Sequence, residues 1–175
     1  MEKSYKEYLK HITTFIFDVD GVLTDGRVTI DGNGELLRTM NVKDGYALKT
    51  ALLQGFNICI ISGGTNTGVK DRLSALGIDS IFLGAHHKLA PFHQYIEKHQ
   101  IKKENILYMG DDIPDIPVMK EVGLPTCPQN AVAEVREIAS YISFKEGGDG
   151  CVRDVIEQVL KVQQKWMRDF DARNV

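Results

Sequence analysis

The chain has 175 residues, of which 43% are hydrophobic and 26% are charged, and its formal net charge is -3. This length suits one domain with a full hydrophobic core, and the composition is that of an ordinary soluble globular protein. The slight acidity argues against a nucleic-acid-binding surface, which usually carries an excess of basic residues. A local basic pocket for a small anion remains compatible with it.

The cysteines and the apolar runs indicate where the protein works. The three cysteines, Cys59, Cys127 and Cys151, are far apart and odd in number. Because Cys59 also lies inside an apolar run, we expect buried free thiols rather than a disulfide or zinc framework. Residues 1–7 lack the apolar core of a signal peptide, and no later run is long enough to span a bilayer. These features predict a cytoplasmic protein with no membrane partner.

Short apolar runs alternate with segments of helical periodicity along the chain. Strands are expected at 12–17, 57–61, 80–83, 105–109, 125–127 and 141–144. Helices are expected at 3–10, 42–54, 65–76, 89–99, 118–122 and 131–138, and from 152 to about 170. This alternation predicts an α/β fold with three layers and a central parallel sheet. Since no linker or repeat divides the chain, we expect a single domain over 1–175 with a helical tail over about 152–175.

The segment 26–41 interrupts this alternation. Two β-prone runs, 27–30 and 35–40, flank the sequence Asp31-Gly32-Asn33-Gly34, which is a good signal for a projecting β-hairpin. The hairpin carries much apolar surface for an excursion from a small domain. It therefore either folds onto its own core or forms an oligomer contact.

Polar side chains follow four of the predicted strands where each strand ends. They are Asp18 and Asp20 after the first, Ser62 after the second, Lys88 after the third, and Asp111, Asp112 and Asp115 after the fourth. Because connections in such sheets are right-handed, these ends should share one edge. Carboxylates from two strands would hold Mg2+, while the hydroxyl and the ammonium would bind an anion against it. Phosphoryl transfer needs this arrangement, and a carboxylate can act as its nucleophile.

Each of these features also has a simpler interpretation. Asp and Gly are common turn residues, so the stretch after the first strand could be a solvated turn. Ser62 could belong to a strand-exit turn, and Lys88 could be a solvated residue at a helix start. His86 and His87 beside Lys88 could suggest a metal site, but hard ions prefer oxygen ligands, and we expect them to be loop residues.

The order of these motifs resembles that of the haloacid dehalogenase (HAD) superfamily of phosphatases. Its signature is Asp-x-Asp-Gly, then Ser or Thr, then Lys, then Gly-Asp-x-x-x-Asp. The resemblance narrows to the 3-deoxy-D-manno-octulosonate (KDO) 8-phosphate phosphatases over residues 17–26, 41–46, 110–119 and 147–154. It implies a Rossmann-like HAD fold. The spacing between the motifs is used up by the hairpin, helices and strand, so we expect no separate cap domain.

The resemblance implies a phosphoric monoester hydrolase that converts KDO 8-phosphate to KDO and phosphate in lipopolysaccharide precursor synthesis. Asp18 would be the nucleophile that becomes an aspartyl-phosphate. Asp20 would protonate the departing sugar oxygen and then deprotonate the attacking water. Asp18, the backbone carbonyl of Asp20, and Asp111 would bind Mg2+. Ser62 and Lys88 would bind phosphoryl oxygens.

The resemblance also implies supporting and substrate-binding residues. Asp112 and Asp115 would orient metal-bound water or Lys88. The positions that align with sugar-acid contacts, some from a neighbouring subunit, are Asn41, Val42, Lys43, Asp44, Gly45, Lys49, Gly63 and Arg72. Charged residues on helices often just face water, so several of these could be solvated, and Arg153 could bind substrate or pair with an acid.

One position departs from the family pattern. The family commonly carries an arginine where this chain has Gly64, and that arginine is a natural partner for the substrate carboxylate. Its loss puts the sugar specificity in doubt rather than the chemistry. Arg72, Lys43 or a residue of a neighbouring subunit could compensate.

The resemblance further implies a homotetramer in which the hairpins join subunits and neighbours cover the active site. The partner would be a small sugar-acid phosphate rather than nucleic acid. The nearest alternative is a phosphatase of a nine-carbon keto-sugar-acid 9-phosphate, such as KDN or N-acylneuraminate 9-phosphate. A non-catalytic HAD-like binding module is disfavoured by intact Asp18, Asp20, Lys88 and Asp111. A response-regulator-like receiver is disfavoured by Asp20 and by the motif at 147–153.

Overall fold

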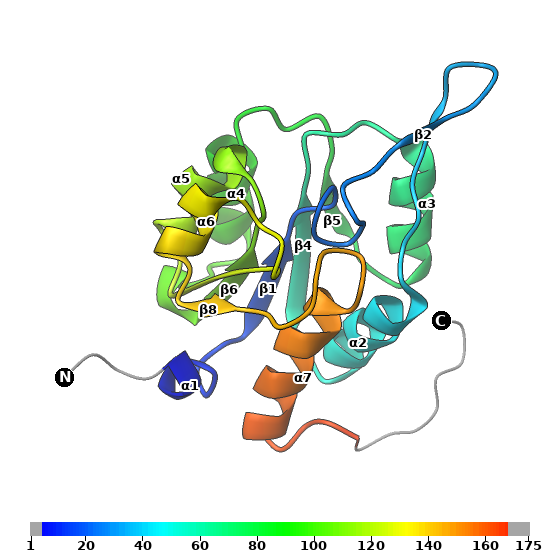
Figure 1. The fold of residues 1–175 in the computed structure, drawn as a ribbon. Helices are drawn as coiled ribbons and strands as arrows, with labels where there is room; N and C mark the ends of the chain where they lie inside the picture. The colour runs from blue at the N-terminus through cyan, green and yellow to red at the C-terminus, as the bar shows by residue number, and fades with distance from the viewer. Residues whose placement is uncertain (1–4, 168–175) are drawn as a thin grey trace.

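The computed structural model describes residues 5–167 and centres on one parallel β-sheet (Figure 1). Its strands are β1 (Thr14–Phe17), β4 (Asn57–Ile61), β5 (Ser80–Phe82), β6 (Ile106–Met109), β7 (Leu124–Cys127) and β8 (Tyr141–Ile142). The strand order is β5-β4-β1-β6-β7-β8, and every neighbouring pair is parallel. The predicted parallel α/β sheet is confirmed.

Helices cover both faces of the sheet and complete the three layers. One face carries α2 (Val42–Leu53), α3 (Thr67–Ala75) and α7 (Cys151–Val162), and the short α1 (Tyr5–Tyr8) precedes β1. The other face carries α4 (Leu89–Lys98), α5 (Ile116–Met119) and α6 (Ala133–Ile138). Successive strand residues point to opposite faces, so Phe15 and Phe17 of β1 pack in the first core layer and Ile16 in the second.

The chain order creates a crevice beside the central strand. β1 lies between β4 and β6 in the sheet. The connection after β1 leads to β4 on one side, whereas the connection after β6 leads to β7 on the other side, so the two connections diverge. In open α/β sheets, ligands bind beyond the carboxyl ends of the strands at such a switch point. Asp18 directly follows β1 and Asp111 lies two residues after β6, so the sequence places acids at this crevice.

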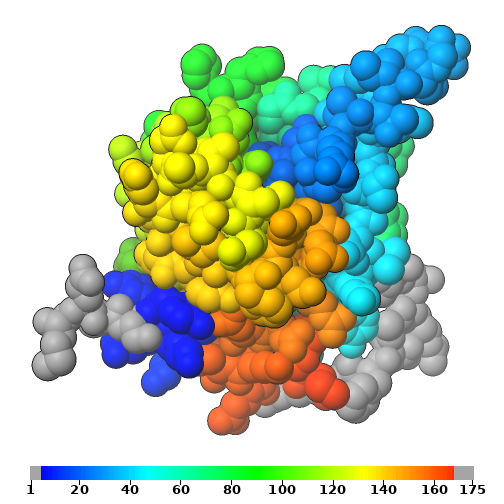
Figure 2. All heavy atoms as spheres, in the orientation of Figure 1, coloured from blue at the N-terminus to red at the C-terminus, as the bar shows by residue number. Residues whose placement is uncertain are grey.

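The predicted hairpin is confirmed and projects from the body of the molecule (Figures 1 and 2). Its strands, β2 (Thr29–Ile30) and β3 (Leu36–Leu37), form a separate antiparallel pair. Ile30 is 68% exposed and Leu37 is 49% exposed, so the hairpin tip does not fold onto the core of its own chain. Between β1 and α4, the described chain forms only this hairpin, α2, β4, α3 and β5, and no separate cap domain.

The prediction of a helix from 152 to about 170 is wrong beyond Val162, where α7 ends. Gln164 and Met167 have positive φ angles of 56° and 58°, which a right-handed helix excludes. The backbone N–H groups of Lys165 and Trp166 both donate to Leu160 O, which folds this segment back on the helix end. Positions 168–175 of the predicted tail lie outside the described residues.

The helix predicted to run through Val118 and Val122 ends earlier, because α5 stops at Met119 and β7 begins at Leu124. The three cysteines are buried and free, as expected. No helix within residues 5–167 is long and apolar enough to cross a membrane.

Candidate active site

The loop after β1 presents the first aspartate and lies against a second acidic loop. Asp18 is only 7% exposed, and its Oδ1 accepts a hydrogen bond from Val19 N at 2.7 Å. Gly21 has a φ of +86°, and a Cβ at this position would overlap the carboxylate of Asp111. Any other residue at this position would be strained, both by the positive φ angle and by the overlap of its Cβ with Asp111. This explains why glycine follows the two aspartates.

Asp115 organises the loop after β6. It is 1% exposed, and both of its oxygens are engaged. Oδ1 accepts from Lys88 Nζ at 2.7 Å and from the Tyr108 hydroxyl at 2.6 Å. Oδ2 accepts from the backbone N–H groups of Asp111 at 3.0 Å and Asp112 at 3.3 Å. Asp115 thus has little capacity left for a metal ion, and its contacts position Lys88 and the Asp111 backbone.

Tyr108 supports the site although no sequence motif indicates it. It lies in the apolar run of β6 and is fully buried, so its sequence neighbours suggest only a residue of the hydrophobic core. The one available signal is its hydroxyl, because a buried hydroxyl needs a hydrogen-bond partner. That partner is Asp115.

Lys88 joins the two acidic loops. Its side chain is 4% exposed, and Nζ lies 3.0 Å from Asp18 Oδ2 and 2.7 Å from Asp115 Oδ1. Burial opposes the ammonium charge, but Asp18 and Asp115 outweigh it, and the net effect raises the pKa of Lys88. Lys88 therefore remains a cation beside Asp18, as a phosphate-binding role requires.

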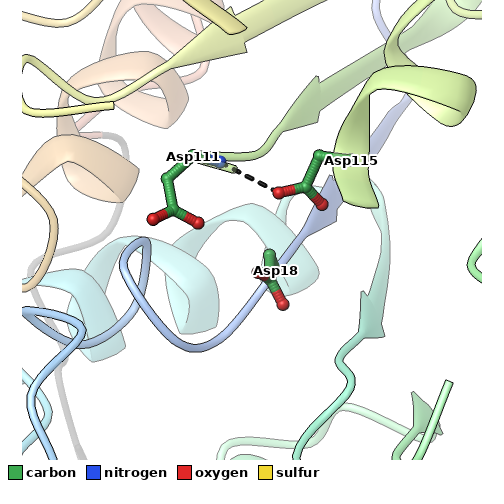
Figure 3. A group of neighbouring side chains, drawn as sticks. All are labelled: Asp18, Asp111 and Asp115. Atoms are coloured by element: carbon green, nitrogen blue, oxygen red, sulfur yellow. Dashed lines mark hydrogen bonds between the residues drawn. The ribbon is translucent and has the colours of Figure 1, made fainter. Parts of the chain in front are cut away.

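Three carboxylates converge at the ends of β1 and β6, as Figure 3 shows. Asp18, Asp111 and Asp115 each offer an oxygen within 4.8 Å of the others. Burial, together with Asp115, raises the pKa of Asp18 to about 7 in spite of Lys88. Burial, together with Asp18 and Asp115, raises the pKa of Asp111 to about 7. The fold therefore holds the ionised forms of Asp18 and Asp111 at a cost in free energy, and a cation bound between them would remove that cost.

Asp111 supplies a direct test of whether a metal ion fits this cluster. Its Oδ1 is buried and has no hydrogen-bond partner among the described residues. Buried carboxylate oxygens are normally paired, so this oxygen is suited to a ligand that the protein itself does not provide. Mg2+ takes oxygen ligands and usually keeps several waters. Asp18 and Asp111 therefore fit a magnesium site, whereas the oxygens of Asp115 are already occupied.

The cluster opens into a cavity of about 370 Å³. The predicted site residues that line it are Asp18, Asp20, Ser62, Gly63, Lys88, Asp111, Asp112 and Asp115. Ser62 is 2% exposed and lies directly after β4, where its Oγ accepts a hydrogen bond from Gly64 N at 3.2 Å. His86 also lines the wall. The predicted meeting of four strand ends at one edge is thus seen in the structure.

The other predicted substrate contacts lie outside this cavity within one chain. Asn41 and Lys43 line a separate cavity of about 490 Å³ together with Arg153. Val42, Gly45 and Lys49 lie along α2. Arg72 lines a third cavity, of about 390 Å³. Roles that depend on a neighbouring subunit remain predictions.

Asp44 has a different environment from the one predicted. Its side chain is 1% exposed, and Oδ1 accepts a hydrogen bond from Arg153 N at 2.7 Å, in the first turn of α7. Burial raises the pKa of Asp44 to about 6. This placement favours a structural role at the junction of α2 and α7 over the predicted substrate contact.

Arg38 contacts the site although no sequence signal pointed to it. From the end of the hairpin, its Nε donates to Asp20 Oδ1 at 2.7 Å and its Nη2 donates to Asp20 Oδ2 at 3.1 Å. A lone arginine in a hairpin usually faces water, so sequence reasoning passes over it. Here its side chain is only 8% exposed.

The glycine-rich segment before α7 supports the loop that carries Asp18 and Asp20. Gly148 N donates to Val22 O at 3.0 Å, and Cys151 Sγ lies 3.2 Å from the same oxygen. A Cβ at Gly147 would overlap the carbonyl of Gly21. The motif at 147–153 therefore packs against the loop that follows β1 and stabilises its position.

Comparisons with known proteins agree with this geometry. A family model described as haloacid dehalogenase-like hydrolase matches residues 81–155. The 3-deoxy-D-manno-octulosonate 8-phosphate phosphatase KdsC of Escherichia coli K12 is 40% identical over 156 residues, which are 89% of this chain and 83% of that protein. KdsC of Yersinia pestis is 35% identical over 155 residues, with the same shares covered.

Solved structures extend the likeness to three dimensions. The 3-deoxy-D-manno-octulosonate 8-phosphate phosphatase from Yersinia pestis matches with a TM-score of 0.91 at 33% identity, over 94% of this chain and 89% of that one. The enzyme from Moraxella catarrhalis, in complex with a magnesium ion, a phosphate ion and a KDO molecule, matches with a TM-score of 0.88 at 34% identity, over 91% and 92%. The chain belongs to the 3-deoxy-D-manno-octulosonate 8-phosphate phosphatase family of haloacid dehalogenase-like hydrolases.

Proposed function

We propose that this protein is a Mg2+-dependent phosphatase that hydrolyses KDO 8-phosphate to KDO and phosphate in lipopolysaccharide precursor synthesis. The observation that carries the proposal is the convergence of Asp18, Asp111 and Lys88 on one cavity at the switch point of the sheet. The name of a relative at 40% identity, a 3-deoxy-D-manno-octulosonate 8-phosphate phosphatase, supports the assignment of this substrate. The three free cysteines support a reducing, cytoplasmic setting.

The first step transfers the phosphoryl group to the protein. A carboxylate oxygen of Asp18 attacks phosphorus and forms the aspartyl-phosphate, while the bond from phosphorus to the sugar oxygen breaks. Asp20, two residues along the same loop, gives its proton to the departing oxygen. Lys88 and Ser62, which line the same cavity, bind the phosphoryl oxygens and hold the group for in-line attack.

The second step returns the protein to its starting state. A water molecule attacks phosphorus from the side that the sugar has left, and Asp20 takes up the proton of this water. The bond from phosphorus to Asp18 breaks, and phosphate leaves with the carboxylate restored. Asp115 acts through others, because it holds Lys88 and the backbone of Asp111 in position.

Asp18, Asp111 and the backbone carbonyl of Asp20 would hold the metal ion. When bound, Mg2+ neutralises the charge that gathers on the transferring phosphoryl group. The chain would contribute the negative charge that binds the ion. Oδ1 of Asp111, which has no hydrogen-bond partner within residues 5–167, is the oxygen most suited to it. The metal complex of the Moraxella catarrhalis relative supports this choice of ion.

Phosphate release from a panel of substrates tests this function. We expect kcat/KM for KDO 8-phosphate to exceed that for glucose 6-phosphate by about 100-fold or more, since a substrate charge that is bound in the site is worth that much. EDTA should abolish the activity, and Mg2+ should restore it. A preference for KDN 9-phosphate or N-acylneuraminate 9-phosphate would instead assign the nine-carbon alternative. Absence of turnover on all four would refute the proposal.

We further propose a homotetramer in which neighbouring subunits cover the catalytic cavity. Such a cavity must exclude water, and the described chain supplies no cap domain to do so. The hairpin offers exposed apolar residues on both of its faces, with Ile30 and Leu36 on one and Leu37 on the other. A second copy of the chain is the occupant that a closed symmetric assembly would place there.

Replacing both Ile30 and Leu37 by aspartate is expected to dissociate this assembly. Each change puts a charge where the contact would be apolar, and a buried unpaired charge is not tolerated. Sedimentation velocity should show the wild type as an oligomer and the double variant as a monomer. Asn33→Asp at the hairpin tip adds a charge without removing an apolar group and should leave the oligomer intact. An unchanged sedimentation profile in the double variant would exclude the hairpin as the contact.

A further inference from the structure

We propose that Arg38 is a specificity-determining residue, which binds the carboxylate of the substrate while the phosphate lies between Ser62 and Lys88. This inference rests on the proposed function. It is supported by the contact of Arg38 with Asp20, which lines the catalytic cavity, and by the low exposure of the Arg38 side chain. It is also supported by the groups that line the neighbouring space around Arg38.

Arg38 is a buried cation that is built into the site. Its side chain is 8% exposed and donates hydrogen bonds to both carboxylate oxygens of Asp20, whose side chain is 35% exposed. Its Nη1 donates to Leu36 O at 3.0 Å, which fixes the guanidinium to the hairpin. Asn66 Nδ2 donates to the same carbonyl at 3.0 Å, which fixes the hairpin to the start of α3. The position of the guanidinium is therefore set by two elements of the chain.

Arg38 lies within reach of the phosphate-binding end of the cavity. A Cβ built on Gly64 would lie 3.4 Å from Arg38 Nη2 and 3.6 Å from Ser62 Oγ, so these two atoms are no more than 7.0 Å apart. It would also lie 3.2 Å from Asp20 Oδ2, a contact tighter than ordinary van der Waals packing. Any side chain at position 64 would therefore compete with Arg38 for this space. Glycine keeps it open.

The surroundings of Arg38 favour a second anionic group. Arg38 and Arg72 line the third cavity, of about 390 Å³. No Asp or Glu is among its lining residues within the described part of the chain. A guanidinium has five N–H donors, and the three contacts above leave two of them unused. A sugar-acid phosphate carries a phosphate and a carboxylate, and its carboxylate would meet Arg38.

In this structure Asp20 accepts from Nε and Nη2 of Arg38, and a substrate carboxylate would compete with Asp20 for these paired donors. An arginine and a carboxylate form two parallel hydrogen bonds, and two carboxylates compete for that geometry. Binding of the substrate carboxylate would free Asp20 to turn toward the sugar oxygen. A substrate without a carboxylate would leave Asp20 held by Arg38. Arg38 thus couples recognition of the sugar acid to the position of the proton donor.

A matched pair of substrates tests this role. KDO 8-phosphate and its carboxyl methyl ester share one leaving group and differ in the charge that Arg38 would bind. We expect the wild type to prefer the acid by about 10- to 100-fold in kcat/KM, the worth of one charge-assisted hydrogen-bonded pair. In Arg38→Gln the preference should fall to near unity, and in Arg38→Lys part of it should remain. Arg27→Gln, at an exposed arginine of the same hairpin, should retain the full preference.

The outcomes separate this inference from the proposed function. If the wild type hydrolyses KDO 8-phosphate but Arg38→Gln keeps the preference for the acid over the ester, the role of Arg38 is refuted and the function stands. Equal losses on both substrates would mean that Arg38 only positions Asp20, which also refutes it. If the wild type fails to hydrolyse KDO 8-phosphate, both proposals fall. Melting temperatures of the two Arg38 variants confirm that each is folded.

Discussion

Asp18→Asn is expected to lower kcat on KDO 8-phosphate by at least about 10⁴-fold, the size of the loss when an enzyme loses its nucleophile. The amide cannot attack phosphorus or form the aspartyl-phosphate, and neither of the two carboxylates that cluster with Asp18 is suited to replace it. Asp115 has both oxygens engaged, and Asp111 carries the oxygen best suited to the metal ion. Phosphate release in the presence of saturating Mg2+ measures the loss.

The fold should survive this substitution. Burial raises the pKa of Asp18, so the folded chain holds the ionised group at a cost, and the amide removes that charge. Lys88 keeps its contact with Asp115. We therefore expect a melting temperature close to that of the wild type. Asp79→Asn, at an exposed aspartate before β5 and far from the carboxyl ends of the strands, should retain full activity. Activity of Asp18→Asn within tenfold of the wild type would exclude Asp18 as the nucleophile.

Removal of the carboxylate that we propose as a metal ligand, Asp111, is the second large effect. Asp111→Asn is expected to abolish the rise in melting temperature that Mg2+ gives the wild type, and to reduce phosphate release by about 10³-fold or more, as loss of a charge-stabilising group does. The amide keeps the shape of the side chain but loses its negative charge. Differential scanning fluorimetry with and without Mg2+ measures the shift. Asp79→Asn should respond to Mg2+ as the wild type does.

The pH dependence of the metal effect follows from the same carboxyl groups. The pKa values of Asp18 and Asp111 in the folded chain are about 7, above the ordinary value of 3.8. A raised carboxyl pKa means that the metal-free fold loses stability as the pH rises from about 4 through 7, because the unfolded chain ionises first. Below about pH 7, Mg2+ has to displace the protons that Asp18 and Asp111 carry in the folded chain. The gain in melting temperature from Mg2+ should therefore be larger at about pH 8 than at about pH 6.

An equal gain at both pH values would mean that Mg2+ does not bind at Asp18 and Asp111. Asp111→Asn adds a second check, because this variant should lack one of the two raised carboxyl groups. Its metal-free melting temperature should therefore fall less steeply than that of the wild type as the pH rises above about 4. A variant with the same pH profile as the wild type would contradict the assigned cause.

The parts of the fold that could be predicted are those with strong local signals. The buried runs that became β1, β4 and β6 end abruptly in Asp or in Ser-Gly, so their boundaries and the chemistry that follows them are visible in the sequence. The hairpin was predictable because Asp-Gly and Asn-Gly pairs readily adopt the positive φ angles of a hairpin turn, and Asp31-Gly32-Asn33-Gly34 lies between two β-prone runs. By contrast, the chain beyond Val162 carries no proline or glycine to end a helix, and the contacts of Leu160 O end it instead.

The parts of the site that could not be predicted depend on tertiary contacts. Tyr108 is one apolar-looking residue in a strand, and only the fold brings Asp115 to its hydroxyl. Arg38 is 18 positions from Asp20 in the sequence, and the path of the hairpin decides that they meet. Asp44 matched a family position, yet its surroundings bury it against the start of α7. Motif order indicates the residues that we propose to react, but it does not indicate those that hold them in position.

The position of the bound metal ion is the most direct observation to make next. Mn2+ takes the same kind of oxygen ligands as Mg2+ and scatters X-rays anomalously, so a crystal soaked in Mn2+ would reveal where the ion binds. We expect one anomalous peak that contacts a carboxylate oxygen of Asp18, Oδ1 of Asp111 and the backbone carbonyl of Asp20. A peak elsewhere, or none in the cavity beside Lys88, would contradict the magnesium-dependent phosphatase site proposed for this chain.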